Sequence, residues 1–238
     1  MEREMKVDRE MAFGEGAWSF DGIEDDFETH IARSIPHYLD WQHLICRLSD
    51  YFMTNDTLVY DIGTATGALA RKISEFQSQR DGFRMVGIDS VASMIEKARS
   101  LSNDKRIEYV CEDIRSFQLE KSSFVTSYYT MQFIHPNYRQ DVVNKIYESL
   151  LWGGGFILFE KVRGHDARFQ DYMSQIYSDF KLENGFTSDE VLGKTKSLKG
   201  VLEPFSSEGN RTMLERAGFR DIMPIARWLC FEGVLAIK

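Results

Sequence analysis

Apolar residues between positions 57 and 160 follow two spacings in turn. Compact runs rich in β-branched and aromatic residues predict strands at 57–62, 84–89, 106–111, 122–131 and 156–160. Between these runs apolar residues recur at helical spacing, as at Val91, Met94, Ile95 and Ala98, which predicts helices. Strands and helices that alternate across long connections form βαβ units, so the pattern predicts a doubly wound α/β domain around a parallel sheet.

The segments before and after this alternation follow other patterns. Residues 1–22 show no sustained period, and we expect an irregular arm with aromatic anchors at Phe13, Trp18 and Phe20. Residues 24–53 predict helices broken near Pro36. We expect the helix predicted at 137–151 to end at the glycines 153–155, because glycine often follows a helix C-terminus.

The last third of the chain predicts a polar helical insertion at 164–203, a helix at about 206–217 and two strand-like runs, 221–227 and 228–238. The expected organisation is an N-terminal arm with lid helices (1–54), an α/β core (55–163), a helical insertion (164–205) and a closing helix and hairpin (206–238).

Composition and charge narrow the class of protein. The 238 residues are 43% hydrophobic and 28% charged, as in ordinary folded proteins. The net charge of −8 argues against nucleic acid as a partner, because such binding relies on neutralising phosphates. The charged N-terminus is not a signal peptide and the apolar runs are too short to span a membrane, so we expect a cytoplasmic protein.

Three cysteines, Cys46, Cys111 and Cys230, are far apart in the chain. Their spacing and odd number argue against a disulfide framework and a zinc cluster, so no metal is expected. We expect each to be a small buried hydrophobic residue in a reducing compartment.

Residues 59–67 run from the first predicted strand into a glycine-bearing turn. Gly63 and Gly67 lack a Cβ and would let the backbone approach a ligand, while Asp61 offers a carboxylate to a cationic group. In an open α/β sheet the ligand crevice lies at the carboxyl ends of the strands. The turn is therefore a candidate ligand site.

Two further acids follow the next two strands. Asp89 could accept hydrogen bonds from both ribose hydroxyls of an adenosine. Asp113 could accept from an adenine amino group while Ile114 packs on the ring. Plainer interpretations exist, since turn glycines are common and Asp89 could cap the following helix. The ordered set of three acids nevertheless favours a nucleotide cofactor.

The identity of the cofactor depends on the glycine pattern. Folds that bind NAD prefer G-x-G-x-x-G, and the matching positions here are Gly63, Ala65 and Ala68, a poor fit. An acid ahead of the first glycine suits S-adenosylmethionine, which has a positively charged amino-acid tail and a sulfonium.

With these features the sequence resembles the class I S-adenosylmethionine-dependent methyltransferases over about residues 55–238. The resemblance implies a Rossmann-like, seven-stranded, mostly parallel sheet with one antiparallel strand, which the final two runs could supply as a hairpin. The expected product is S-adenosylhomocysteine. The cofactor-binding set comprises Tyr38, Asp61, Gly63, Thr64, Ala65, Gly67, Asp89, Ser90, Met94, Asp113, Ile114 and Tyr128.

A closer resemblance, over nearly the whole length, is to the carboxy-S-adenosylmethionine synthases of the bacterial tRNA wobble-uridine pathway. It rests on residues in the arm, the core and the insertion: 18–20, 33–36, Tyr38, 94–96, 113–115, 130–134, Pro136, 145–147, 160–161, 179–181, 184–185 and 217–219. This resemblance implies a homodimer, and it implies that Tyr38 packs on the cofactor.

Two positions depart from that family's pattern. The family transfers a carboxyl group from prephenate to the cofactor, and an arginine of the insertion holds the product's carboxylate. The matching position here is Thr195, flanked by Lys194 and Lys196, and a threonine cannot make the bidentate fork of an arginine. An asparagine at the end of strand four is matched by Tyr128.

The candidate catalytic residues lie just past strand four. Tyr128 or Tyr129 could face the sulfonium in a cation–π contact, or could simply pack in the sheet. His135 could be a general base, or part of a simple turn. Glu160 and Lys161 could line an acceptor pocket or pair with each other.

Because of Thr195, the favoured hypothesis is an S-adenosylmethionine-dependent methyltransferase that acts on a small-molecule acceptor. The alternatives are a carboxy-S-adenosylmethionine synthase that tolerates Thr195, and a cofactor-binding protein without catalysis.

Overall fold

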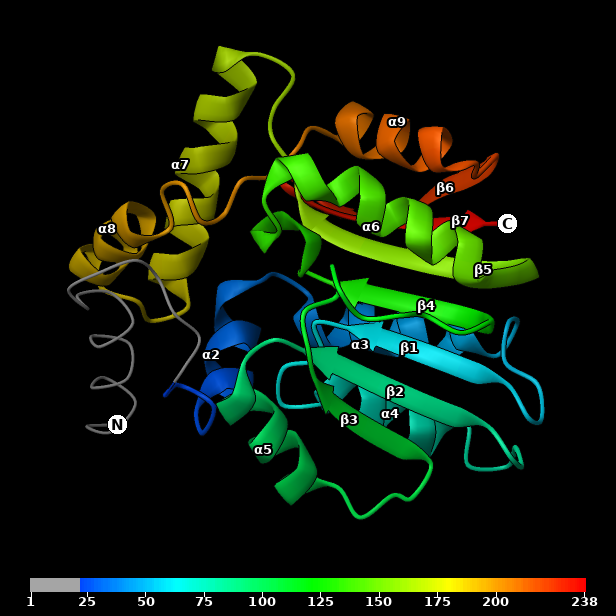
Figure 1. Ribbon diagram of the computed structural model, residues 1–238. Coiled ribbons are helices and arrows are strands. Elements are labelled where there is room, and N and C mark those ends of the chain that lie inside the picture. The colour runs from blue at the N-terminus through cyan, green and yellow to red at the C-terminus, as the bar shows by residue number, and fades with distance from the viewer. Residues whose placement is uncertain (1–21) are drawn as a thin grey trace.

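The computed structural model describes residues 22–238, so the expected arm and its anchors Phe13, Trp18 and Phe20 lie outside the described residues. The described chain forms one sheet in the order β3-β2-β1-β4-β5-β7-β6 (Figure 1). Its strands are β1 (Leu58–Ile62), β2 (Arg84–Asp89), β3 (Ile107–Cys111), β4 (Ser122–Tyr128), β5 (Leu150–Lys161), β6 (Asp221–Trp228) and β7 (Phe231–Ile237).

Strands β1 to β5 pair in parallel, whereas β7 runs antiparallel between β5 and β6. The strand order reverses between β1 and β4. In open α/β sheets ligands bind at the carboxyl ends of the strands beside such a reversal. The predicted doubly wound, seven-stranded sheet with a closing hairpin is confirmed.

Helices cover both faces of the sheet. One face packs against α3 (Tyr38–Ser49), α4 (Ala68–Phe76) and α5 (Ala92–Leu101), with residues such as Ile45, Ile73 and Ile95 in a shared core. The other face packs against α6 (Pro136–Ser149) and α9 (Ser207–Ala217), through Ile146 and Leu214. Three more helices, α2 (Phe27–Ser34), α7 (Ala167–Glu183) and α8 (Ser188–Ser197), lie beyond the arrowheads of the parallel strands (Figure 1).

The structure corrects the expectation that glycines 153–155 end a helix. Helix α6 ends at Ser149, and the glycines lie inside β5. A Cβ on Gly155 would lie 2.8 Å from the ring of Phe52, and one on Gly154 would lie 3.0 Å from the Ser123 carbonyl oxygen. Crowding inside the sheet, and not a helix end, therefore explains these two glycines.

Strand β4 is shorter than predicted. It ends at Tyr128, because Tyr129 adopts a positive φ of 63° and the chain then forms a 3-10 turn, η1 (Met131–Phe133). A left-handed tyrosine is a strained conformation that normally persists only where surrounding contacts hold it.

All three cysteines are free thiols. Cys46 and Cys230 are buried as expected, but Cys111 is exposed because it ends β3 at the rim of the sheet. Within residues 22–238, no helix is both long and apolar enough to cross a membrane.

Candidate cofactor and acceptor site

The turn after β1 is built around the carboxylate of Asp61. Its Oδ2 accepts from the Thr64 hydroxyl at 2.7 Å, and its Oδ1 accepts from the Thr126 hydroxyl at 2.8 Å. Asp61 is 1% exposed, and burial raises its pKa to about 6. The Asp61 carboxylate therefore stabilises the turn through hydrogen bonds with Thr64 and Thr126. A contact between Asp61 and a ligand stays a prediction.

The two predicted turn glycines are needed by the protein's own packing. Gly63 and Gly67 have φ values of 73° and 78°, which favour glycine. A Cβ on Gly63 would lie 2.0 Å from the Thr130 hydroxyl oxygen, and one on Gly67 would lie 2.5 Å from the Tyr109 hydroxyl oxygen. The backbone of this turn is thus held close to Tyr109 of β3 and to Thr130, which follows β4.

Asp89 ends β2 beside the same turn. Its carboxylate accepts from the Ala65 backbone N–H at 3.0 Å and from the Val91 N–H at 2.9 Å. Burial raises its pKa. An ionised carboxylate has about four acceptor positions, so Asp89 retains capacity for a ribose hydroxyl. Ser90 follows it at the rim, and Met94 is buried against Ala65 and Ile23.

At the third strand the structure differs from the simple expectation. Asp113 Oδ2 accepts from the Arg115 guanidinium at 2.6 and 2.9 Å, and its Oδ1 accepts from the Arg115 backbone N–H. This pairing lowers the pKa of Asp113. Ile114 is buried under the α6 face. An adenine amino group that donates to Asp113 would therefore share the carboxylate with the Arg115 guanidinium.

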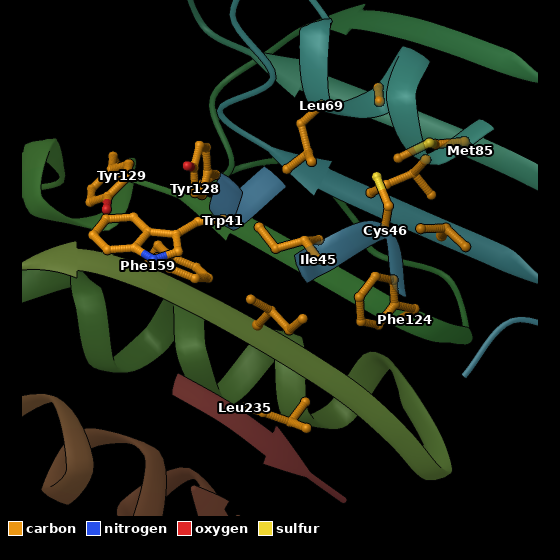
Figure 2. Close-up of a cluster of buried hydrophobic side chains, with 14 of the residues drawn as sticks. Trp41, Ile45, Cys46, Leu69, Met85, Phe124, Tyr128, Tyr129, Phe159 and Leu235 are labelled. Atoms are coloured by element: carbon orange, nitrogen blue, oxygen red, sulfur yellow. The ribbon is translucent and has the colours of Figure 1, made fainter. Parts of the chain in front are cut away.

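Aromatic rings form a wall where β4 and β5 end. Figure 2 shows Tyr128, Tyr129 and Phe159 gathered with Trp41 at one end of the buried cluster. The Tyr128 ring lies 4.9 Å from the Tyr38 ring, and its hydroxyl donates to the Tyr38 carbonyl oxygen at 2.6 Å. Burial holds the pKa of the Tyr128 phenol well above its ordinary value, so Tyr128 can offer a ring face but not a base.

His135 lies at the start of α6 and is exposed. Its Nδ1 accepts from the Asn137 backbone N–H at 3.3 Å, which caps the helix. This hydrogen bond is typical of a residue that caps a helix. A role of His135 as a general base stays a prediction.

The lid and the insertion contact each other directly. Arg33 of α2 donates from Nε to the Asn184 carbonyl oxygen at 3.1 Å, and its guanidinium lies 4.7 Å from the Phe186 ring centroid. The Tyr177 hydroxyl of α7 donates to the Ser34 carbonyl oxygen at 3.0 Å. The motif residues of the arm and of the insertion thus meet in one junction.

Thr195 does not supply a carboxylate anchor. Its side chain is exposed, and its hydroxyl donates to the Val191 carbonyl oxygen of its own helix. The neighbouring Lys194 contacts the His30 ring of α2. Lys194 therefore belongs to the junction between lid and insertion.

Sequence patterns did not reveal how two residues of α7 pack, and they left the role of Glu160 open. On α7 Lys181 is 6% exposed and Tyr177 is half-buried, where the sequence predicts a polar helical insertion. Their spacing of one helical turn was the available signal. Glu160 is 4% exposed and unpaired with Lys161, which lies on the other face of β5.

The sheet, the turn after β1 and the acids after β2 and β3 define an S-adenosylmethionine-dependent transferase with a methyltransferase fold. A methyltransferase domain family matches residues 59–154. The carboxy-S-adenosyl-L-methionine synthase of Staphylococcus epidermidis is 36% identical, covering 93% of this chain and 97% of that protein. That of Helicobacter hepaticus is 34% identical, covering 89% and 90%. The chain belongs to the family of the carboxy-S-adenosyl-L-methionine synthases.

Solved structures share the fold at much lower identity. An S-adenosylmethionine-dependent methyltransferase from Mesorhizobium loti has a TM-score of 0.57 at 16% identity, covering 82% of this chain and 96% of that one. Human N-acetylserotonin methyltransferase, solved in complex with S-adenosylmethionine, has a TM-score of 0.54 at 18% identity, covering 90% and 59%.

Proposed function

We propose that this protein transfers the methyl group of S-adenosylmethionine to a small-molecule acceptor. The observation that carries the proposal is Thr195, which stands where the resemblance expects an arginine and whose hydroxyl is engaged within α8. Without a bidentate guanidinium a carboxylated cofactor has lost its geometric anchor.

The residues of the chain have separate tasks in this proposal. Asp89 would hold ribose hydroxyls, and the turn from Gly63 to Gly67 would bring backbone N–H groups against the amino-acid tail. When bound, the cofactor supplies an activated methyl carbon. The protein then has to align the acceptor and exclude water. The ring faces of Tyr38 and Tyr128 suit a cationic centre, because aromatic faces attract cations.

A second candidate function is carboxy-S-adenosylmethionine synthesis. It is supported by 36% identity across nearly all of the Staphylococcus epidermidis protein, including the insertion. In that case another cation of this chain must replace the missing arginine.

One experiment separates the two candidates. Ligands released from freshly purified protein are identified by mass spectrometry, and the protein is then incubated with methyl-labelled S-adenosylmethionine and a panel of small acceptors. Labelled acceptor together with S-adenosylhomocysteine supports methyl transfer. A co-purified carboxylated cofactor, or its formation from prephenate, would replace the proposal with the second candidate.

We further infer a homodimer in the cytoplasm. Three apolar side chains of α7, Phe169, Tyr172 and Ile176, are 52%, 57% and 46% exposed at helical spacing. A row of exposed apolar residues suits an interface between two copies. The free thiols fit a reducing compartment.

A further inference from the structure

Two adjacent tyrosines at the end of β4 lie on the same face of the sheet. Successive side chains of a strand point to opposite faces, so a residue that continued β4 after Tyr128 would point toward α6. The Tyr129 ring nevertheless belongs to the same buried cluster as Tyr128, and the two ring centroids lie 4.8 Å apart (Figure 2). The positive φ of Tyr129 breaks the alternation and thereby places both rings in one wall.

Hydrogen bonds hold the backbone of Tyr129 on both sides. Its N–H donates to the Phe159 carbonyl oxygen at 2.8 Å, and its carbonyl oxygen accepts from Gln132 Nε2 at 3.3 Å. The Gln132 Oε1 accepts from the Lys161 backbone N–H at 2.9 Å. One bond needs a donor and the other an acceptor, and a side-chain amide supplies both. Gln132 thus joins the turn after β4 to the end of β5.

The backbone of Gln132 is anchored as well. Its carbonyl oxygen accepts from Nη2 of Arg139, on α6, at 3.0 Å and from the Glu203 N–H at 3.1 Å. The Arg139 Nη1 also donates to the Glu203 carbonyl oxygen at 2.7 Å. Both Gln132 and Arg139 are buried. The turn is therefore tied to α6, to β5 and to the segment that leaves the insertion.

We propose that Gln132 is a positioning residue for the cofactor: it holds the left-handed turn at Tyr129, and through that turn it directs the ring face of Tyr128 toward the sulfonium. A strained backbone persists only where neighbouring contacts fix it. Without the Gln132 amide, Tyr129 would relax toward an extended conformation and its ring would leave the wall. This inference rests on the proposed function, from which it takes the contact between the Tyr128 ring and the cationic centre.

A comparison of S-adenosylmethionine with S-adenosylhomocysteine separates positioning from general structural support. The first compound carries a sulfonium and the second a neutral thioether, so a ring face against the sulfur favours the first. A general loosening of the crevice would weaken both compounds alike. The ratio of their dissociation constants, measured by calorimetry with the full chain, therefore reports the position of the aromatic wall.

We expect Gln132→Met to shift this ratio toward S-adenosylhomocysteine by about three- to tenfold relative to the parent. Gln132→Glu keeps the shape and the acceptor for the Lys161 N–H, but it has an oxygen in place of the donor to Tyr129. It should shift the ratio in the same direction, and it provides the measurement if the methionine variant does not fold.

The matched control is Gln77→Met, at another buried glutamine with two partners. Gln77 Nε2 donates to the Ser49 hydroxyl oxygen at 2.9 Å, and its Oε1 accepts from Arg80 Nε at 2.6 Å. Gln77 caps the C-terminus of α4, whereas the cofactor turn leads into the N-terminus of that helix. Gln77→Met should therefore lower the melting temperature and leave the ratio as in the parent.

Three results would overturn the inference: an unchanged ratio in the folded Gln132 variants, an equal loss of affinity for both compounds, or a shift of the same size in Gln77→Met. Tyr128→Leu tests the contact on which the inference rests. A shift in Tyr128→Leu alone would contradict the positioning role and leave that contact standing. An unchanged ratio in Tyr128→Leu would contradict the contact and the inference together.

The proposed methyl transfer can fail separately. A shifted ratio in the Gln132 and Tyr128 variants, without methyl transfer to any acceptor by the parent, would contradict the proposed function. The positioning role of Gln132 would then stand, because both measurements concern the binding of the cofactor and involve no acceptor.

Discussion

Two buried acids show how the same desolvation produces different chemistry at single residues. Asp61 has a hydroxyl donor on each oxygen, whereas Glu160 leaves Oε1 without a partner within the described chain. Burial raises the pKa of Glu160 to about 8, although Arg139 partly opposes the shift. Burial therefore favours the protonated form of Glu160, whereas the two hydroxyl donors favour the ionised form of Asp61.

The protonation of Glu160 predicts a specific pH dependence. Its folded-state pKa exceeds its ordinary value, so the folded protein keeps a proton that the unfolded chain releases, and stability falls as pH rises through that window. Relative to Glu160→Gln, the parent should lose up to about 1.4 kcal/mol per pH unit between about pH 5 and pH 8. Urea unfolding of both proteins across this range measures the difference, and parallel curves would show that Glu160 is ionised when folded.

Asp89 allows a second prediction at the residue scale. Asp89→Asn replaces one acceptor oxygen with an N–H₂ group that faces a backbone donor, Ala65 or Val91. We expect S-adenosylhomocysteine to bind about tenfold more weakly or worse, with a loss of about 1–3 kcal/mol in unfolding free energy. Calorimetry and urea unfolding measure these effects. Glu108→Gln, on the exposed edge of the neighbouring strand, should change neither.

At the scale of elements, the lid helix α2 is fastened to the insertion and not to the core alone. Phe186, between α7 and α8, is buried under the Arg33 guanidinium and lies edge-on to the His30 ring at 5.3 Å. The lid and the insertion should therefore open together, while the sheet stays protected.

Phe186→Ala tests this coupling. Replacing a buried phenylalanine by alanine lowers the unfolding free energy by about 3–5 kcal/mol where the cavity cannot collapse. Here the destabilisation should be confined to the junction between α2 and the insertion. Amide hydrogen exchange should rise in α2 and α8 and remain unchanged in β1 and β4. Tyr51→Ala removes an exposed ring between α3 and β1 and should leave every segment as in the parent. Uniform acceleration throughout the chain would contradict local coupling.

The element order was predictable from sequence because each βα unit carries its own local signal. Ile62 and Gly63 mark a strand that enters a turn, and Val91 to Ala98 mark a helix face. The prediction that the glycines 153–155 end a helix was wrong, because the local sequence cannot reveal the Phe52 ring that packs against Gly155. Contacts between distant segments were equally invisible, so the hydrogen bond between Gln132 and Lys161 needed the structure.

For the whole molecule, the exposed row on α7 predicts the state of association. If two copies meet through Phe169, Tyr172 and Ile176, light scattering should give the mass of a dimer for the parent. Tyr172→Asp would place a charge in the interface and should give monomers with an unchanged circular dichroism spectrum. Met223→Asp, at an exposed apolar residue of β6, is the control and should remain dimeric. A monomeric parent would contradict the inferred dimer.

The position of β7 between β5 and β6 affects how the chain folds during its synthesis. Strand β6 is synthesised before β7 but reaches the sheet only through it, so β6 has no neighbour to pair with as it leaves the ribosome. During the same interval the edge of β5 that β7 later covers is open, and an open strand edge is a template for association with other chains. Slow translation between residues 221 and 231 would lengthen that exposure and lower the yield of folded protein.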